Sequence, residues 1–166
     1  MASKAALSVE EYLRTSFPGV DPEYCDGEIV ERSFPDYLHG KIQLNFGAFF
    51  KPYRKTLNLY AGSEVRLPIR LGRFIIPDAA VFWPIEPLNS PPHERPLIVV
   101  EILSPDDRMS DVRAKLQEYT DWGVPHIWLV DPATRSLFIC KDGLHEVPSL
   151  HIPEVNLTVT PADIFD

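Results

Sequence analysis

The sequence predicts an α/β protein in which helices flank a central mixed β-sheet, and three segments carry this prediction. Residues 36–53 and 110–122 place apolar side chains at helical spacing, whereas residues 96–104 form an almost continuous apolar run. Such a run is typical of a strand that is covered on both faces. Because the second helix, which Gly123 is expected to end, separates this strand from an apolar run at 126–131, we expect the two strands to be parallel.

The elements before this unit are shorter. Ser8 and Glu11 have the spacing of a capping box, which predicts a helix over residues 8–16. Asp26 and Gly27 predict a turn that leads into a short strand. Segments with alternating or β-rich apolar side chains predict strands at 29–30, 58–69 and 73–83.

The C-terminal part continues the sheet. Asp131 and Pro132 predict a turn between the run at 126–131 and a strand that begins at Ser136. A short closing helix is expected near the end of the chain, because Thr160 is a suitable N-cap and is followed directly by a proline.

Length and composition indicate a globular protein with one domain over residues 1–166. No apolar stretch approaches the ~20 residues that cross a bilayer, so we expect no membrane association. The first residues lack the apolar core of a secretory signal. Cys25 and Cys140 lie far apart and without metal-ligand spacing. We therefore expect no disulfide framework and a cytoplasmic location.

The net charge of −8 argues against binding DNA through general electrostatic attraction. A cluster of carboxylates around a metal ion would reverse the charge locally. Five arginines are candidates for phosphate contacts, and the alternative for them is a solvated surface with scattered ion pairs. They are Arg66, Arg70, Arg73, Arg108 and Arg113.

Glu101 is the most informative polar residue. Side chains alternate along a strand, so Glu101 shares one face of the run at 96–104 with Val99 and Leu103. A carboxylate within a doubly covered strand is costly unless it is paired, protonated or bound to a cation. A functional role is favoured over the alternative, in which the strand opens toward solvent at Glu101.

Asp78 and Lys115 gain meaning from their surroundings. Asp78 follows Pro77, which donates no ladder hydrogen bond, so this strand is expected to be bulged or at an edge, where a carboxylate can be aimed into a site. The alternative is a capped Pro-Asp turn. Lys115 borders the buried face of its helix, and its alternative is an i,i+4 pair with Asp111, worth only ~0.2–0.5 kcal/mol.

A longer pattern surrounds these residues: DPEYCDGEIV, then His39, then IPDAAVF, VVEILSPDDR, SDVRAKLQEYTDWGV and IWLVDP. In order and spacing, this pattern resembles the Uma-two-type family of restriction endonucleases, within the PD-(D/E)XK nuclease superfamily. The resemblance covers nearly the whole chain, from about Ser8 to the final helix. It implies a restriction-endonuclease-like core in which the Pro-Asp pair is Pro77-Asp78.

The resemblance also implies a site. Asp78 and Glu101 would be the metal-binding carboxylates, and the backbone carbonyl of Ile102 would complete the ligand set. The lysine that the superfamily places two residues after the glutamate is replaced here by Leu103. The resemblance implies that Lys115 supplies the amine from the adjacent helix.

Two further positions match the family. Glu23 corresponds to an additional acidic position and joins Asp78, Glu101 and Lys115 in the predicted catalytic set; the alternative is a solvated loop residue. His39 matches a histidine on the first core helix. It would orient the substrate or a group of the site, or be structural, and we do not assign it as catalytic.

The resemblance implies a Mg²⁺-dependent endonuclease that hydrolyses phosphodiester bonds of DNA, with Mn²⁺ as a possible substitute. Two alternatives stay open: a catalytically inactive module of the same fold that binds nucleic acid or protein, and a metal-dependent phosphoesterase that acts on RNA or small esters. Many enzymes of this architecture are dimers. A homodimer interface is therefore predicted around Phe82, Trp83 and Ile85, although aromatic residues on strands are more often core.

Overall fold

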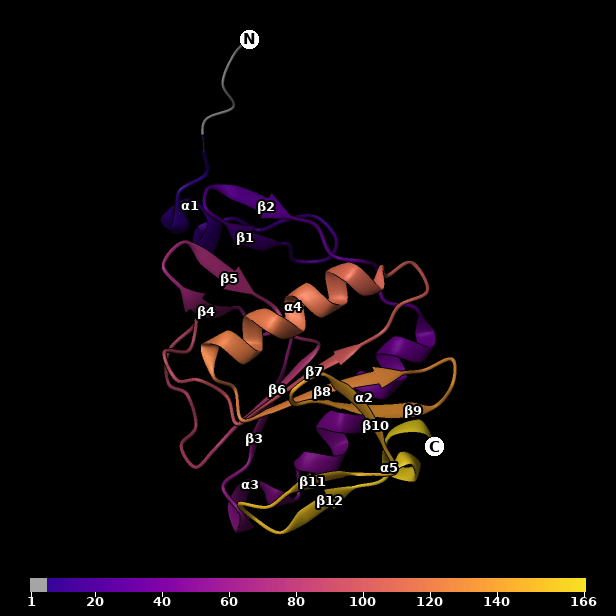
Figure 1. Ribbon diagram of the computed structural model, residues 1–166. Helices are drawn as coiled ribbons and strands as arrows, with labels where there is room; N and C mark the ends of the chain where they lie inside the picture. Colours follow the sequence, from indigo (N-terminus) through magenta and orange to yellow (C-terminus); the bar gives the residue numbers. More distant parts are fainter. Residues whose placement is uncertain (1–5) are drawn as a thin grey trace.

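The computed structural model describes residues 6–166, and Figure 1 shows helices packed around a large sheet. The helices are α1 (Val9–Arg14), α2 (Tyr37–Phe50), α3 (Tyr53–Thr56), α4 (Met109–Trp122) and α5 (Pro161–Phe165). The strands are β1 (Glu23–Cys25), β2 (Glu28–Val30), β3 (Tyr60–Ser63), β4 (Leu67–Arg70), β5 (Arg73–Ile75), β6 (Ala79–Phe82), β7 (Ile98–Ile102), β8 (His126–Asp131), β9 (Ser136–Cys140), β10 (Leu144–Val147), β11 (Leu150–Ile152) and β12 (Leu157–Val159).

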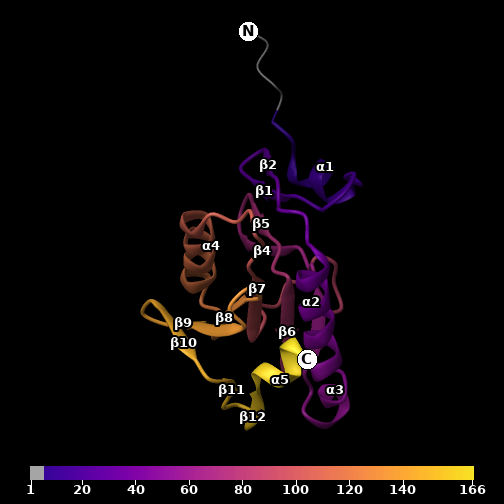
Figure 2. The same cartoon turned by 90° about the vertical axis from the view of Figure 1, so that its right-hand side faces the viewer.

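The largest sheet is mixed, with strand order β10-β9-β8-β7-β6-β3. Its central pair, β7 and β8, is parallel, and the other neighbours in the sheet pair antiparallel. Helix α4 connects the two parallel strands and covers one face of the sheet, while α2 covers the other (Figure 2). The predicted mixed sheet and its parallel βαβ unit are therefore confirmed.

The core is divided by β7 into two apolar layers. On the α2 side, Ile98, Val100 and Ile102 join a cluster that includes Ile42 and Phe46 of the helix. Each of these five side chains is almost fully buried, which favours folding by roughly 1.5–3 kcal/mol for a side chain of this size. The alternation predicted for β7 holds, and β7 is held between two helices.

On the opposite face, Val99 packs with Leu116 and Tyr119 of α4. Glu101 lies on this same face, one position further along the alternation, and only 9% of its surface is exposed. The strand therefore does not open toward solvent at Glu101. Gly123 ends α4 with a left-handed backbone, as its position after the helix predicts.

The predictions of single strands at 58–69 and 73–83 are wrong, because each segment forms two strands in different sheets. β3 and β6 pair in the large sheet, whereas β4 and β5 pair in a second sheet of order β2-β1-β5-β4. Glu64, with φ of 52°, turns the chain between β3 and β4. Pro77 interrupts the second segment, since it donates no ladder hydrogen bond. Asp78 consequently lies in the break that joins the two sheets.

Several local predictions are confirmed. The capping box of Ser8 and Glu11 is present at α1. Asp26 and Gly27 both have positive φ and form the turn between β1 and β2. Thr160 caps α5. The structure also contains elements that were not predicted: α3, β1, β10, β11 and β12.

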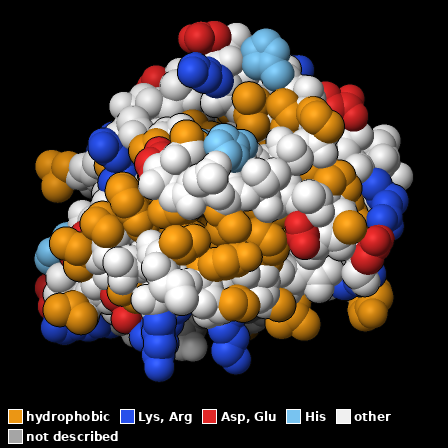
Figure 3. Space-filling view, turned by 90° about the horizontal axis from the view of Figure 1, so that it is seen from below, with side chains coloured by type: hydrophobic (Ala, Val, Ile, Leu, Met, Phe, Trp, Pro, Cys, Tyr) orange, Lys and Arg blue, Asp and Glu red, His pale blue; other side chains and the backbone are white. Residues whose placement is uncertain are grey.

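The segment predicted as a dimer interface is only partly on the surface. Phe82 is 4% exposed and belongs to the core, whereas Trp83 and Ile85 are 36% and 66% exposed. Hydrophobic side chains also gather on the face seen in Figure 3, at the end of the molecule that carries α3 and β12. The homodimer stays a prediction. Among residues 6–166, no helix is long and apolar enough to cross a membrane.

Candidate functional site

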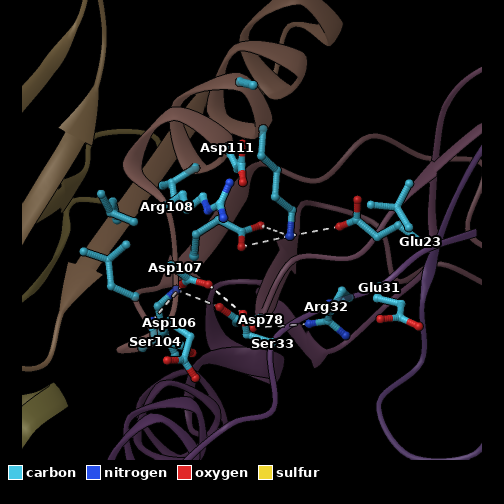
Figure 4. A pocket seen from close by; sticks show the side chains of 18 of the residues that line it. Glu23, Glu31, Arg32, Ser33, Asp78, Ser104, Asp106, Asp107, Arg108 and Asp111 are labelled. Atoms are coloured by element: carbon cyan, nitrogen blue, oxygen red, sulfur yellow. Dashed lines mark hydrogen bonds and ion pairs between the residues drawn. The ribbon is translucent and has the colours of Figure 1, made fainter.

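A pocket of about 470 Å³ opens where β1, the end of β7 and the start of α4 meet. Three of the carboxylates that line it, those of Glu23, Asp78 and Glu101, are buried. They come from three separate parts of the chain, and Figure 4 shows Glu23 and Asp78 among the side chains that line the pocket. Burying several carboxylates together is costly in free energy, so each of them needs partners that balance its charge.

Asp78 is held by donors from three elements. The backbone N–H of Ile102 donates to its Oδ2 at 2.7 Å, which ties the strand break to the end of β7. Its Oδ1 lies 3.1 Å from Nε2 of His39 and 3.3 Å from a guanidinium nitrogen of Arg32. Burial alone would raise the pKa of Asp78, but His39, the nearby ammonium group of Lys115 and the Ile102 N–H hold that pKa below its ordinary value.

Glu101 projects from β7 toward α4 and is bound by two side chains of that helix. The hydroxyl of Tyr119 donates to Oε1 at 2.6 Å, and the ammonium of Lys115 lies 2.9 Å from the same oxygen. Burial, together with a smaller effect of the charge of Asp78, raises the pKa of Glu101 to about 7 against the opposing effect of Lys115. Of the three buried carboxylates, Glu101 is the one whose pKa is raised, so it takes up a proton most readily.

Lys115 connects the carboxylates. Its Nζ lies 3.0 Å from Oε1 of Glu23 and donates to the carbonyl oxygen of Ile76 at 2.8 Å, in addition to its contact with Glu101. Burial disfavours the ammonium form, but the surrounding carboxylates outweigh burial and raise the pKa of Lys115. The amine from α4 thus reaches the end of β7. Leu103 instead packs at the edge of the apolar cluster on the α4 side.

Glu23 is a buried connecting residue and not a solvated loop residue. Its Oε1 accepts from the backbone N–H of Ile76 at 3.0 Å, and its Oε2 pairs with Arg73 at 2.9 Å. Burial would raise the pKa of Glu23, but Lys115, the Ile76 N–H and Arg73 together lower it. Glu23 therefore stays ionised and contacts the same ammonium of Lys115 that Glu101 contacts.

His39 links α2 to both sides of the site. Besides its contact with Asp78, its Nδ1 lies 3.2 Å from Oγ of Ser104, just beyond β7. Burial lowers the pKa of His39, and the hydrogen bond and charge of Asp78 raise it by more. Because both ring nitrogens are engaged within the protein, this geometry orients the carboxylate of Asp78.

The chemistry of the donor set fits a small oxygen-preferring cation. Asp78 and Glu101 supply carboxylate oxygens beside the Ile102 backbone, and Mg²⁺ commonly binds through one or two carboxylates while it keeps several waters. Within residues 6–166, no three His, Cys, Asp or Glu side chains gather as a metal-binding group. A cation at the two carboxylates would also relieve their mutual repulsion.

The model of the Uma2 family, described as "Putative restriction endonuclease", matches residues 9–164. The chain belongs to the Uma2 family. Its fold is shared with the crystal structure of "a putative nuclease belonging to DUF820 from Anabaena variabilis", at a TM-score of 0.73 and 22% identity over 96% of this chain and 97% of that one. The fold class and the family resemblance predicted from the sequence are thus both confirmed.

A DrdV–DNA complex matches more distantly, at a TM-score of 0.34 and 16% identity over 76% of this chain and 87% of that chain. That score does not establish a common fold. None of the curated proteins matches this Uma2 family member.

Three of the five arginines predicted to contact phosphate are occupied within the protein. Arg73 is 6% exposed and pairs with two glutamates, so the prediction for it is wrong. Arg66 forks onto Asp21, and Arg70 pairs with Asp26. Arg70 is nevertheless exposed, as are Arg108, which lines the pocket of this Uma2 protein, and Arg113.

Sequence reasoning missed two residues of the site. Tyr119 follows Lys115 by one helical turn, so its hydroxyl was detectable as a neighbour of Glu101 once the helix was assigned. Arg32 lies in an irregular segment between β2 and α2 and contacts Asp78, which is 46 residues away. No local pattern marks such a residue.

Proposed function

We propose that this Uma2 family member is a metal-dependent endonuclease that hydrolyses phosphodiester bonds of DNA. Asp78, Glu101 and the backbone carbonyl of Ile102 would hold Mg²⁺, for which Mn²⁺ can substitute. One observation carries the proposal: the buried carboxylates of Asp78, just before β6, and of Glu101, on β7, meet the ammonium of Lys115 from the next helix in a single open pocket. Membership in the Uma2 family supports it.

The residue types suit the chemistry. A phosphodiester is anionic and repels a hydroxide nucleophile, and a bound divalent cation supplies both water activation and charge neutralisation at the phosphoryl oxygens. The Lys115 ammonium is preorganised beside Glu101, where it would stabilise negative charge that develops in an in-line displacement. The expected product carries a 5′-phosphate.

The other buried residues act as positioning residues in this proposal. Tyr119 fixes the Glu101 carboxylate, His39 fixes Asp78, and Glu23 holds the Lys115 ammonium. Each contact removes rotational freedom from a group that must be aligned with the substrate. Misplacement of such groups by about 1 Å can reduce a rate by about a hundredfold.

The test is metal-dependent nicking of supercoiled plasmid DNA by the full chain and by Glu101→Gln. The variant keeps the shape of the side chain but removes its charge, and we expect nicking to fall by about a hundredfold or more. Glu86→Gln is the matched control, because Glu86 is exposed and pairs with Arg54 outside the pocket. Nicking by folded Glu101→Gln at the normal rate would contradict the assignment.

One observation favours a second candidate, a metal-dependent phosphoesterase acting on RNA or small esters. The pocket mouth is acidic, with Glu31, Asp106, Asp107 and Asp111 among its lining residues. Such a rim disfavours the dense charge of a DNA duplex. Parallel assays with duplex DNA, single-stranded RNA and a small phosphodiester separate the candidates, since turnover of only the last two would exclude the DNA assignment.

A further inference from the structure

Besides the exposed Arg108, two largely buried arginines line the candidate pocket, Arg32 and Arg73, and their contacts differ. Arg73 makes five hydrogen bonds, at 2.7, 2.8, 2.9, 3.0 and 3.2 Å. They saturate the guanidinium with the carboxylates of Glu23 and Glu118 and with two backbone carbonyls. Arg73 has no donor left for a ligand and belongs to the framework of the pocket.

Arg32 is also largely buried, with 11% of its side chain exposed, but all its polar contacts are long. It lies 3.3 Å from Oδ1 of Asp78, 3.7 Å from Oε2 of Glu64 and 3.4 Å from the carbonyl oxygen of Asp21. Charge-assisted hydrogen bonds between such groups are normally about 2.7–2.9 Å. The guanidinium therefore stands in the pocket without a close partner, and Figure 4 shows it directed at Asp78.

The backbone that carries Arg32 is anchored on its C-terminal side. Oγ of the next residue, Ser33, donates to Asp107 at 2.9 Å, which fastens this segment to the loop before α4. Asp36 then caps α2 by accepting from the backbone N–H of His39 at 2.8 Å. The side chain of Arg32 can thus change partners within the pocket while its own backbone stays in place.

We propose that Arg32 is a substrate-binding residue that exchanges Asp78 for a phosphate oxygen of the nucleic acid strand. This inference rests on the proposed function. Arg32 now lies 3.3 Å from Oδ1 of Asp78, a carboxylate that the proposed function assigns to the divalent cation. When a cation binds this carboxylate, repulsion between like charges favours the departure of Arg32, and a phosphate beside the cation is the nearest anion that the proposal supplies.

The chemistry of the group fits this role. A guanidinium presents a planar fork of donors that matches two phosphate oxygens, which an ammonium does not. The other buried cations of the pocket are committed, Arg73 as described and Lys115 through its contacts with Glu23, Glu101 and Ile76. Arg32 is consequently the buried cation that a phosphate can recruit without breaking a tight ion pair.

The experiment compares the full chain with Arg32→Met, Arg32→Lys and the control Arg54→Met. Arg54 is an exposed arginine that pairs with Glu86 and does not line the pocket. Three quantities are measured: the affinity for Mn²⁺ in the absence of nucleic acid, the affinity for a fluorescent DNA oligonucleotide with Ca²⁺ in place of Mg²⁺, and the KM and kcat of cleavage with Mg²⁺. Thermal melting checks that each variant folds.

We expect Arg32→Met to weaken oligonucleotide binding and raise KM by about 10- to 100-fold, the range for a charge-assisted contact. Mn²⁺ affinity should be unchanged or higher, because a competing cation has been removed. Arg32→Lys should recover part of the binding, and Arg54→Met should behave like the full chain. A fall in Mn²⁺ affinity with a proportional fall in oligonucleotide binding would overturn the proposal and make Arg32 a positioning residue of Asp78.

Failure of the two proposals can be told apart. If the full chain binds and cleaves DNA and Arg32→Met does so equally well, only the role of Arg32 is refuted. If the full chain neither binds the oligonucleotide nor cleaves any phosphodiester, the proposed function is refuted, and the substrate-binding role of Arg32 is refuted with it.

Discussion

The two faces of β7 show how one strand serves both folding and chemistry. Toward α2, its side chains are Ile98, Val100 and Ile102, all packed in an apolar cluster. Toward α4, Val99 is apolar, but the next position is Glu101, surrounded by Lys115 and Tyr119. The free-energy cost of burying the charge of Glu101 is therefore offset by Lys115 and Tyr119, which both come from α4, the helix packed on that face. The other face contributes only packing.

Among the changes that test this comparison, metal removal should have the largest effect. It should affect cleavage by the site on the α4 face and leave folding intact. Chelation by EDTA should abolish nicking, by about three orders of magnitude or more, since water activation and charge neutralisation are lost together. Added Mg²⁺ or Mn²⁺ should restore it. Plasmid nicking gives the readout, with circular dichroism as the control for folding; nicking that survives in EDTA would refute metal dependence.

Lys115→Met should damage both stability and activity. It leaves Glu23 and Glu101 buried without their shared cation, which typically costs about 3–5 kcal/mol. Cleavage per folded molecule should fall by about a hundredfold. Urea unfolding and nicking assays measure the two effects. A variant as stable as the full chain would show that Lys115 does not balance these carboxylates.

Ile98→Ala tests the α2 face. It removes a fully buried side chain from the apolar cluster, and we expect a loss of about 2–5 kcal/mol in the free energy of unfolding. Cleavage per folded molecule should stay near that of the full chain. Comparison of the urea midpoint with kcat checks this, and a large drop in kcat at full folding would mean that the two faces are coupled.

Tyr119→Phe should have the smallest effect, and it tests a single hydrogen bond on the α4 face. It removes the hydroxyl that donates to Glu101 and leaves the ring in its apolar contacts. We expect unfolding to be easier by about 1–3 kcal/mol, because a buried acceptor loses a donor. We also expect a drop of about tenfold in kcat, because Glu101 is less well fixed. Kinetics unchanged from those of the full chain would assign the hydroxyl to stability alone.

Much of the fold followed from local patterns. The run around Glu101 is apolar on both sides, and the helix after it has one apolar face, so the parallel βαβ unit was predictable from sequence spacing. The break at Pro77 was only half predicted. A missing N–H implies an interruption, but it does not say that β5 and β6 belong to different sheets.

The residues of the candidate site divide in the same way. From sequence, Asp78, Glu101, Lys115 and Glu23 were proposed as a set through family resemblance, and the structure brings their side chains into one pocket. The arginines were not separable, because an arginine bound to a buried glutamate and one free to meet a ligand look alike in a linear chain. Arg73 was one of five candidates for phosphate contacts but is saturated, and Arg32 was not among the candidates.

By itself the sequence determined the alternation of β7, the amphipathic faces of its helices, the caps and the Uma2 family. Tertiary structure alone decided which charges neutralise which: Glu23 reaches Arg73 across 50 residues, and Arg32 reaches Asp78 across 46. The periodicity of apolar side chains depends on residues that are close in sequence, so it can be recognised from the sequence alone. Ion pairing depends on distance in space, and that distance exists only once the sheets and helices have packed.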